Sequence, residues 1–356
     1  PERFLNGDLT TPLVVAETGF GTGLNFLITW QAWKQLPSPK RPLHFFSIEK
    51  YPLRQQDLSK ALSNWPELDQ FIQALIKQYP PLVNGLQALE FEAGQVRLNL
   101  LFGDISTDLS STHFKADAWY LDGFAPKKNP EMWTDNFCKL IADKSQHGTT
   151  FSTFTSASIV RKSLLNAGFS VQKQEGFGKK REMLLGDYSN KNTPQLKQAL
   201  WLYSEPDSKS GLVPISESEP DYDVAIIGAG LAGVSTAHTL MQQGLRVCLI
   251  EKNAAPVMGA SGQTQLAMYA KLPSEANKLF NFTLQALSGS IRFYKHLQSE
   301  AKHTFWYPSG LMQLAWNPKE QIKQQRFLRN IQLPQELIRF IDAQEASDKS
   351  GLNINA

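Results

Sequence analysis

Residues 223–252 read DVAIIGAGLAGVSTAHTLMQQGLRVCLIEK, and their spacing decides the fold of the part of the chain that contains them. The apolar run 224–227 predicts a buried parallel strand, and the run 247–250 predicts a second strand. Between them, the turn GAGLAG opens a helix whose first backbone N–H groups can bind a pyrophosphate. The second strand ends at Glu251, where a carboxylate can accept hydrogen bonds from ribose hydroxyls. The unit therefore predicts a Rossmann fold that binds an ADP-containing cofactor.

The three glycines of this turn have different expected roles. Gly228 permits the tight turn, Gly230 lets a phosphate approach the backbone, and Gly233 lets the helix lie close to the sheet. A glycine turn alone is also common where only packing requires it, so the prediction depends on the whole strand, turn, helix, strand and acid unit. The acid at the end of the second strand argues against NADP.

The composition predicts a folded protein with more than one domain. The chain has 356 residues, of which 42% are hydrophobic, and its net charge of +3 neither requires nor excludes a polyanionic partner. Cys138 and Cys248 lie in apolar patterns, which fits core thiols in a reducing compartment, so we expect a cytoplasmic protein. No apolar run reaches the roughly 20 residues that span a bilayer. The histidines show no metal-ligand spacing, so we expect neither membrane nor metal, and the oligomeric state stays open.

The order of the patterns predicts three parts. Apolar strands alternate with helical stretches up to residue 189, which predicts an α/β domain with a parallel, doubly wound sheet over 1–189. The last two expected strands, FSVQKQEG and REMLLGDY, are close enough in sequence to form an antiparallel hairpin at the sheet edge. Residues 190–221 are rich in Ser, Pro, Asn, Gln and Lys and form a candidate linker. The dinucleotide-binding unit then begins a second domain over 222–356.

A second glycine-rich turn occurs in VVAETGFGTGLN, residues 14–25. It again joins a strand to a helix, but Glu17 ends the strand, and in class I methyltransferases such an acid meets the methionine part of S-adenosylmethionine. Glu49 ends the next strand, where it can accept ribose hydroxyls, and Asp104 follows a third, where it can meet the adenine amine. Each acid alone fits a helix N-cap or a solvated position equally well. Together with the glycine turn, they favour a cationic, hydroxyl-rich ligand.

The fourth strand ends in YLDGFAP, residues 120–126, at the edge where open α/β sheets place their chemistry. This element is similar to the Asp-Pro-Pro-Tyr element of amine methyltransferases. An amine attacks carbon only when its lone pair is free, so the site must accept a proton or hold the neutral amine, with an aromatic wall that excludes water. Asp122 is the candidate acceptor, and Phe124 and Trp133 are candidate walls. A turn aspartate followed by core aromatics is the alternative.

Positive charge is concentrated between Arg161 and Arg181, where six cations accompany one acid. This stretch is either a strip that binds phosphates or a solvated helix face followed by an exposed hairpin. The sequence by itself leaves both interpretations open.

Four segments together resemble one family: ETGFGTGLNF, LDGFAPKKNPEMW, FTSASIVRKSLLNAGF with GFGKKREM, and the flavoprotein-type unit. Almost the whole chain is similar to the bacterial bifunctional tRNA 5-methylaminomethyl-2-thiouridine biosynthesis proteins. The resemblance implies a class I methyltransferase domain, followed by an FAD-binding Rossmann domain of the glycine oxidase or D-amino acid oxidase-like type. It also implies two reactions on the wobble uridine of the tRNA anticodon. FAD-dependent removal of the carboxymethyl group from 5-carboxymethylaminomethyl-2-thiouridine comes first, and S-adenosylmethionine-dependent N-methylation of the 5-aminomethyl product follows.

The resemblance also implies roles for particular residues, carried over motif by motif. Asp122 is implied to bind the amine. The implied contacts to S-adenosylmethionine are Glu17, Gly19, Gly21, Gly23, Asn25, Glu49 and Asp104. The implied contacts to FAD are Gly228, Gly230, Gly233, Glu251, Lys252, Ala260 and Ser261. The implied contacts to tRNA are Lys127, Lys128, Lys179, Lys180 and Arg181.

The flavin-type domain departs from the family pattern in two ways. The segment GASG, residues 259–262, follows the acid as in glycine oxidase-like enzymes, but Gln263 and Leu266 stand where the family more often has Asn and a later Gly. The domain is also shorter than an amine-oxidising flavoprotein requires, so we expect a partial domain whose amine-oxidation residues lie outside this chain.

Two other functions stay open at this point. One is a small-molecule amine N-methyltransferase fused to an amino-acid oxidase. The other is a tRNA-binding scaffold without activity, in which the nucleotide pockets are vestigial.

Overall fold

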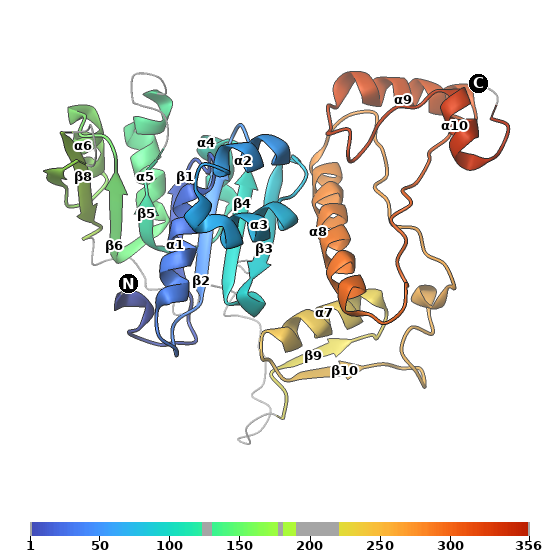
Figure 1. Ribbon diagram of the computed structural model, residues 1–356, viewed down its shortest axis with the longest axis horizontal. Helices are drawn as coiled ribbons and strands as arrows, with labels where there is room; N and C mark the ends of the chain where they lie inside the picture. The colour runs from blue at the N-terminus through green and yellow to red at the C-terminus, as the bar shows by residue number, and fades with distance from the viewer. Residues whose placement is uncertain (1, 123–129, 177–180, 190–220, 355–356) are drawn as a thin grey trace, which may run out of the picture. The chain divides into compact units, whose positions relative to one another are not determined.

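The computed structural model describes residues 2–122, 130–176, 181–189 and 221–354 (Figure 1). The chain forms two compact units, of which the first comprises residues 1–91, 95–202 and 270–356 and the second comprises 92–94 and 203–269. The candidate linker 190–221 lies, except for its last residue, outside the described residues. The domain boundaries expected at 189 and 222 stay a prediction.

The first unit contains an eight-stranded sheet in the order β3-β4-β2-β1-β5-β6-β8-β7. The strands are β1 (Leu13–Thr18), β2 (Leu43–Glu49), β3 (Gly85–Phe91), β4 (Val96–Phe102), β5 (Ala116–Tyr120), β6 (Ser145–Thr153), β7 (Gln172–Glu175) and β8 (Glu182–Asp187). The five strands from β4 to β6 in this order run parallel, which confirms the predicted parallel sheet. The predicted hairpin at the edge is β7 paired antiparallel with β8. The antiparallel edge strand β3 was not expected from the sequence.

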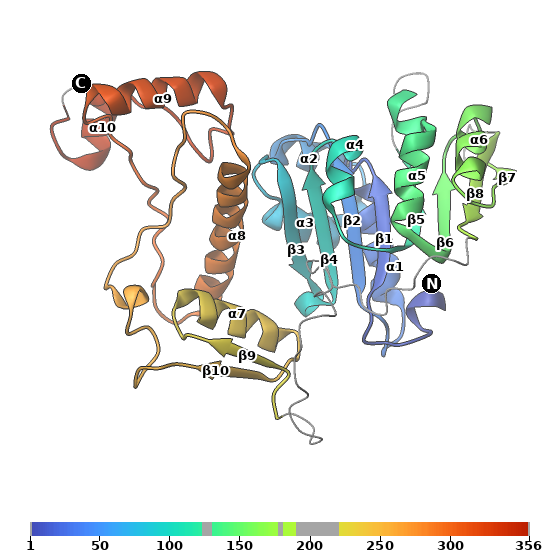
Figure 2. The ribbon, with the colours of Figure 1, turned by 180° about the vertical axis from the view of Figure 1, so that it is seen from behind.

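Helices cover both faces of this sheet. They are α1 (Leu24–Gln35), α2 (Gln55–Leu62), α3 (Asp69–Gln78), α4 (Ile105–Asp108), α5 (Asp135–Asp143) and α6 (Ser158–Asn166). Successive side chains of β1 point to opposite faces, so Val15 joins a core with α1, α2 and α3, and Val14 joins a core with α5 and α6. Figure 1 shows α1 and α3 on one face, and Figure 2 shows α5 from the other side. The sheet is therefore doubly wound, as predicted.

Cys138 lies in the second of these cores, on α5. Its side chain is buried, and burial raises the pKa of the thiol to about 12. The expectation of an inert core thiol is confirmed for Cys138, because a protonated, buried sulfur is a poor nucleophile.

The second unit contains the parallel strands β9 (Val224–Ile227) and β10 (Val247–Ile250), joined through α7 (Leu231–Gln242). Both strands have the bounds that the sequence predicted. The prediction that the strand Val224–Ile227 is buried is wrong, since Ile227 is 88% exposed. The physical reason is that the described part of this unit has a sheet of only two strands, with α7 as its only α-helix.

The remaining helices of the first unit are α8 (Lys278–Glu300), α9 (Pro318–Asn330) and α10 (Ala343–Ser350). α8 and α9 share a small core in which the Phe280 and Phe327 rings meet edge to face. Among the described residues, none of the helices combines the length and apolar character that crossing a bilayer requires.

Candidate functional site

The first site lies at the carboxyl edge of the parallel sheet in the first unit. The register pairs Glu17 of β1 with Ser47 of β2 on one side and with Tyr120 of β5 on the other. Because parallel strands end at the same edge, Glu17 and Glu49 lie near Asp122, which follows β5. β4 also runs parallel to β2, with Phe102 beside Glu49, so Asp104 follows a strand at the same edge. The structure therefore brings all four acids that the sequence singled out for this site to one edge.

Asn25 connects two of these acids. It lies in the first turn of α1, which Gly23 introduces in the left-handed conformation. Its side-chain Nδ2 donates to Glu17 Oε1 at 2.7 Å and to Asp122 Oδ2 at 3.3 Å. The Asn25 side-chain amide thus donates one hydrogen bond to each of the two carboxyl groups and fixes the position of one relative to the other.

Glu17 is an unusual carboxylate because only 1% of the residue is exposed. Its second oxygen accepts from Ser47 Oγ at 2.7 Å. Burial raises the pKa of Glu17 from 4.5 to about 8, and the charges of Asp122 and Glu49 act in the same direction, while the two hydrogen bonds oppose them. Near neutral pH, the folded chain without ligand therefore keeps a proton on Glu17.

Glu17→Gln should remove a pH-dependent loss of stability. In the wild type, the folded state holds the Glu17 proton up to about pH 8, whereas an unfolded chain releases it near 4.5. As the pH rises between these values, the free energy of unfolding therefore falls, by at most about 1.4 kcal/mol per pH unit. Glutamine can accept from Asn25 and donate to Ser47, so the variant should fold and show a flatter profile.

Denaturant unfolding of the ligand-free chain at several pH values, followed by tryptophan fluorescence, measures this difference. The exposed Glu67 provides the control, since Glu67→Gln should leave the pH profile of the wild type unchanged. Equal slopes for the wild type and Glu17→Gln would show that Glu17 titrates normally.

Glu49 is held by the backbone of two turns. Its Oε2 accepts from Gly21 N at 2.9 Å, and its Oε1 accepts from Tyr51 N at 2.8 Å. A Cβ built on Gly21 would meet no atom within 4 Å, so open space lies beside this glycine. A Cβ on Gly23 would lie 2.5 Å from the Phe20 ring, so local packing accounts for that glycine. Gly19, Gly21 and Gly23 all have positive φ, which favours glycine.

Asp104 takes the helix-cap position that the sequence left open as an alternative. One carboxylate oxygen accepts from the backbone N–H and the hydroxyl of Ser106 at the start of α4. The other forms an ion pair with Lys50 Nζ at 2.7 Å. The hydrogen bond from Lys50, followed by those from Ser106, lowers the pKa of Asp104 to about 2. Its contact with an adenine amine stays a prediction.

Asp122 is exposed at the sheet edge, and its backbone oxygen accepts from Thr18 Oγ1 at 2.6 Å. Trp133 does not line an open wall beside it, because the indole is 2% exposed and packs edge to face against Phe137 and Phe154. Trp133 is thus a core aromatic residue, which was the alternative interpretation of the sequence. Phe124 lies outside the described residues.

The second site is the glycine turn between β9 and α7. Gly228 has a φ of 98°, and its N–H donates to Ile250 O at 2.7 Å. A Cβ on Gly233 would overlap the carbonyl oxygen of Gly228, so the helix lies as close to the turn as the sequence predicted. A Cβ on Gly230 would lie 3.2 Å from Ser261 Oγ, the end of a short side chain. Gly233 is therefore the more restricted position.

Glu251 and Ser261 both accept hydrogen bonds from the backbone of this turn. Glu251 Oε2 accepts from Ala229 N at 2.8 Å, and this bond, with those from the backbone N–H and side chain of Asn253, lowers the pKa of the carboxyl. Ser261 Oγ accepts from Leu231 N at 3.1 Å, at the first turn of α7. The short helix Ala260–Gly262 thus lies at the helix terminus where a pyrophosphate was predicted, and Lys252 is exposed beside Glu251.

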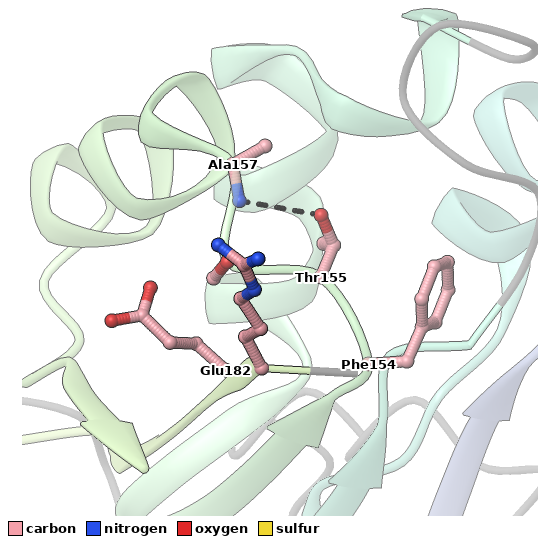
Figure 3. A pocket seen from close by; sticks show the side chains of 6 residues that line it. Phe154, Thr155, Ala157 and Glu182 are labelled. Carbon is pink, nitrogen blue, oxygen red and sulfur yellow. Dashed lines mark hydrogen bonds between the residues drawn. The ribbon is translucent and has the colours of Figure 1, made fainter. Parts of the chain in front are cut away.

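The predicted tRNA contacts are described only in part. Arg181 is exposed at the start of β8 and lines a pocket together with residues at the end of β6 (Figure 3). The other four, Lys127, Lys128, Lys179 and Lys180, lie outside the described residues. Within the described part of the chain, no group of three or more His, Cys, Asp or Glu residues is arranged to hold a metal ion.

Two functional candidates were missed from the sequence. Ser47 is fully buried and donates to Glu17, and the hydroxyl of Thr18 holds the backbone beside Asp122. The available signal for Ser47 was a serine between the apolar residues Phe46 and Ile48 of the strand LHFFSIE, since a buried hydroxyl needs a partner.

Family comparisons relate two stretches of the chain to known domains. Residues 66–189 match a family described as S-adenosyl-L-methionine-dependent methyltransferase, and residues 223–355 match a family described as FAD dependent oxidoreductase. These matches confirm the predicted fold class, with a methyltransferase domain before an FAD domain, and the two predicted cofactors.

The chain is also similar to proteins named tRNA 5-methylaminomethyl-2-thiouridine biosynthesis bifunctional protein MnmC. It is 42% identical to the protein of Marinobacter nauticus, over 99% of this chain and 53% of that protein. It is 40% identical to the protein of a Marinomonas species, over 95% of this chain and 48% of that protein. The chain thus spans about half the length of the curated relatives it matches. The crystal structure of MNMC2 from Aquifex aeolicus is 27% identical, with a TM-score of 0.40, and the match covers 50% of this chain and 54% of that chain.

Proposed function

This chain is a relative, over almost its whole length, of the bifunctional tRNA 5-methylaminomethyl-2-thiouridine biosynthesis proteins, and we propose that it takes part in both steps of wobble-uridine modification. The first unit transfers a methyl group from S-adenosylmethionine to the primary amine of a 5-aminomethyl-2-thiouridine in tRNA. The domain that begins at residue 223 contributes to the preceding step, in which the carboxymethyl group is removed.

The observation that carries the methyl-transfer proposal is the connection of Glu17 to Asp122 through Asn25. It joins the acid of the glycine turn, where the methyl donor is expected, to the acid at the end of β5, where the amine is expected. A methyl transfer requires donor and acceptor in line and at close range, which a fixed frame between their binding residues provides.

Asp122 has a specific proposed role in this reaction. The substrate amine arrives protonated near neutral pH, and only its neutral form has the lone pair that attacks carbon. The Asp122 carboxylate accepts a hydrogen bond from the amine, or its proton, and Asn25 orients the carboxylate by donating to Oδ2.

The electrostatics of the edge support a cationic ligand. Glu17 is hard to ionise because it is buried and because Asp122 and Glu49 are nearby. A ligand that brings positive charge offsets this repulsion and favours loss of the Glu17 proton. S-adenosylmethionine carries a sulfonium and an ammonium group, so its binding should release a proton from Glu17.

The glycine turn of the second unit supports the FAD proposal. Gly233 lets α7 approach the turn, and Glu251 directly follows β10, where a ribose diol is expected. FAD supplies the electron acceptor that oxidation of the secondary amine to an imine requires. Hydrolysis of the imine then releases glyoxylate and leaves the aminomethyl group that the first unit methylates.

The test uses the purified chain, S-adenosylmethionine and tRNA that carries 5-aminomethyl-2-thiouridine. Digestion and mass spectrometry should identify a nucleoside that is heavier by one methyl group, and tRNA with unmodified uridine at this position should gain none. Absence of a methylated nucleoside would contradict the proposal.

Salt dependence separates tRNA from a small-molecule amine as the substrate. Binding that depends on several phosphate contacts falls steeply as the salt concentration rises. A flat response would favour the small-molecule methyltransferase. The cytoplasmic location stays a prediction.

A further inference from the structure

A pocket of about 250 Å³ lies at the end of β6 in the first unit (Figure 3). It is lined by Phe154, Thr155, Ser156, Ala157, Arg181 and Glu182. The first four residues connect β6 to α6, Arg181 directly precedes the neighbouring strand β8, and Glu182 is the first residue of β8. None of them except Arg181 was singled out as a site residue from the sequence.

The sheet register places this pocket at the same edge of the sheet as Asp122, one strand away. Tyr120 of β5 pairs in parallel with Ser152 of β6, and Leu121 N donates to Ser152 O at 2.9 Å. Asp122 and Phe154 each follow the ends of these two paired strands, so both lie at the same edge of the sheet. β8 is the next strand after β6, so the start of β8 is about 10 Å from the end of β5, which is two strand spacings.

The polar groups of the pocket suit an anion. Arg181 is exposed, and none of the described residues accepts a hydrogen bond from its guanidinium. The residue Thr155 is 8% exposed, and its hydroxyl accepts from Ala157 N at 3.3 Å, which leaves the hydroxyl hydrogen for a second partner. The single carboxylate, Glu182, is paired with Lys173 Nζ at 2.7 Å. A guanidinium together with hydroxyl donors is a typical phosphate-binding set.

Phe154 forms the aromatic side of the pocket and packs against the protein core. The Phe154 ring meets the buried Trp133 ring edge to face, at a centroid distance of 6.4 Å. Phe154 therefore closes the pocket toward the core, and the donors of Thr155, Ser156 and Arg181 remain for the ligand.

We propose that this pocket binds a backbone phosphate of the substrate nucleotide while the aminomethyl group of the same nucleotide lies at Asp122. The inference rests on the proposed methyl transfer to a nucleotide amine. The base and sugar of one nucleotide can bridge two strand spacings, so both ends can be held together. The pocket would thereby select an amine on a nucleic acid over a free amine.

The test compares binding of 5-aminomethyluridine with that of its 5′- and 3′-monophosphates, by nuclear magnetic resonance titration of the 356-residue chain. At least one monophosphate should bind about tenfold or more tightly than the nucleoside, as expected for charge-assisted hydrogen bonds. Arg181→Gln should abolish this preference and leave nucleoside binding unchanged. Arg181→Lys should retain part of it, because lysine keeps the charge but loses the planar fork.

Lys139→Gln is the matched control, since it removes one positive charge from an exposed position on α5. This variant should keep the preference for the monophosphate. The proposal is overturned if the wild type binds nucleoside and monophosphates equally, or if Arg181→Gln weakens both classes of ligand to the same extent.

If the proposed methyl transfer itself were wrong, the experiments would give a different result. Methyl transfer to tRNA would then be absent in the wild type, whereas the dependence of phosphate binding on Arg181 could still be measured. Methyl transfer without any phosphate preference would instead leave the function standing and reject the pocket.

Discussion

Asp122→Ala should lower the rate of methyl transfer by about 10²- to 10⁴-fold, the usual contribution of a positioned proton acceptor. Its carboxylate lies at the end of β5 and is held through Oδ2 by Asn25. Binding of S-adenosylmethionine should change little, because Glu17 and Glu49 keep their other hydrogen bonds in the variant. Single-turnover rates and calorimetric titration with S-adenosylmethionine measure the two quantities separately.

Two further variants make this result specific. Asp122→Asn keeps an oxygen that can accept from Asn25 but cannot take a proton, so it should retain the fold and remain slow. Asp57→Ala removes an exposed carboxylate on α2 and should behave as the wild type. Methyl transfer at the wild-type rate in Asp122→Ala would show that another residue accepts the amine.

Gly233→Val should lower the affinity for FAD by roughly 10- to 100-fold or more, the cost of forcing extra atoms into a closely packed position. Any Cβ at this position overlaps the backbone oxygen of Gly228, and backbone cannot move aside as a side chain can. α7 must therefore shift away from the turn that is expected to hold the pyrophosphate. Visible flavin absorbance that remains with the chain after gel filtration measures the effect.

The comparison with other glycines tests the proposed cause. Gly230→Ala should have a smaller effect, because the nearest atom is Ser261 Oγ at 3.2 Å. Gly289→Ala, on α8, meets nothing within 4 Å and should retain flavin as the wild type does. Methyl transfer should be normal in all three variants. Loss of methylation together with flavin would contradict two independent sites.

Local sequence patterns were sufficient for most of the fold. The strands Val224–Ile227 and Val247–Ile250, the glycine turns and the hairpin of β7 and β8 were all predicted. These features depend on neighbours in sequence, since strand periodicity and the left-handed conformations of glycine are properties of short segments. The edge strand β3 was missed because nothing local to GLQALEF determines the strand with which it pairs.

The acids of the candidate site were predicted better than their surroundings. The sequence singled out Glu17, Glu49 and Asp122 at strand ends, and the structure places them at one edge. The sequence did not show that Asp104 caps α4, or that Trp133 lies in the core. Both outcomes depend on contacts made after the chain has folded, as does the pairing of Ser47 with Glu17.

The sequence by itself determined two glycine-turn nucleotide units, their order and the identity of the acids that follow their strands. Only the tertiary structure decided that one amide, from Asn25, holds Glu17 and Asp122 together. The physical reason is that strand and turn formation follow from local backbone geometry, whereas the burial and hydrogen bonding that raise the pKa of Glu17 arise from segments far apart in the chain.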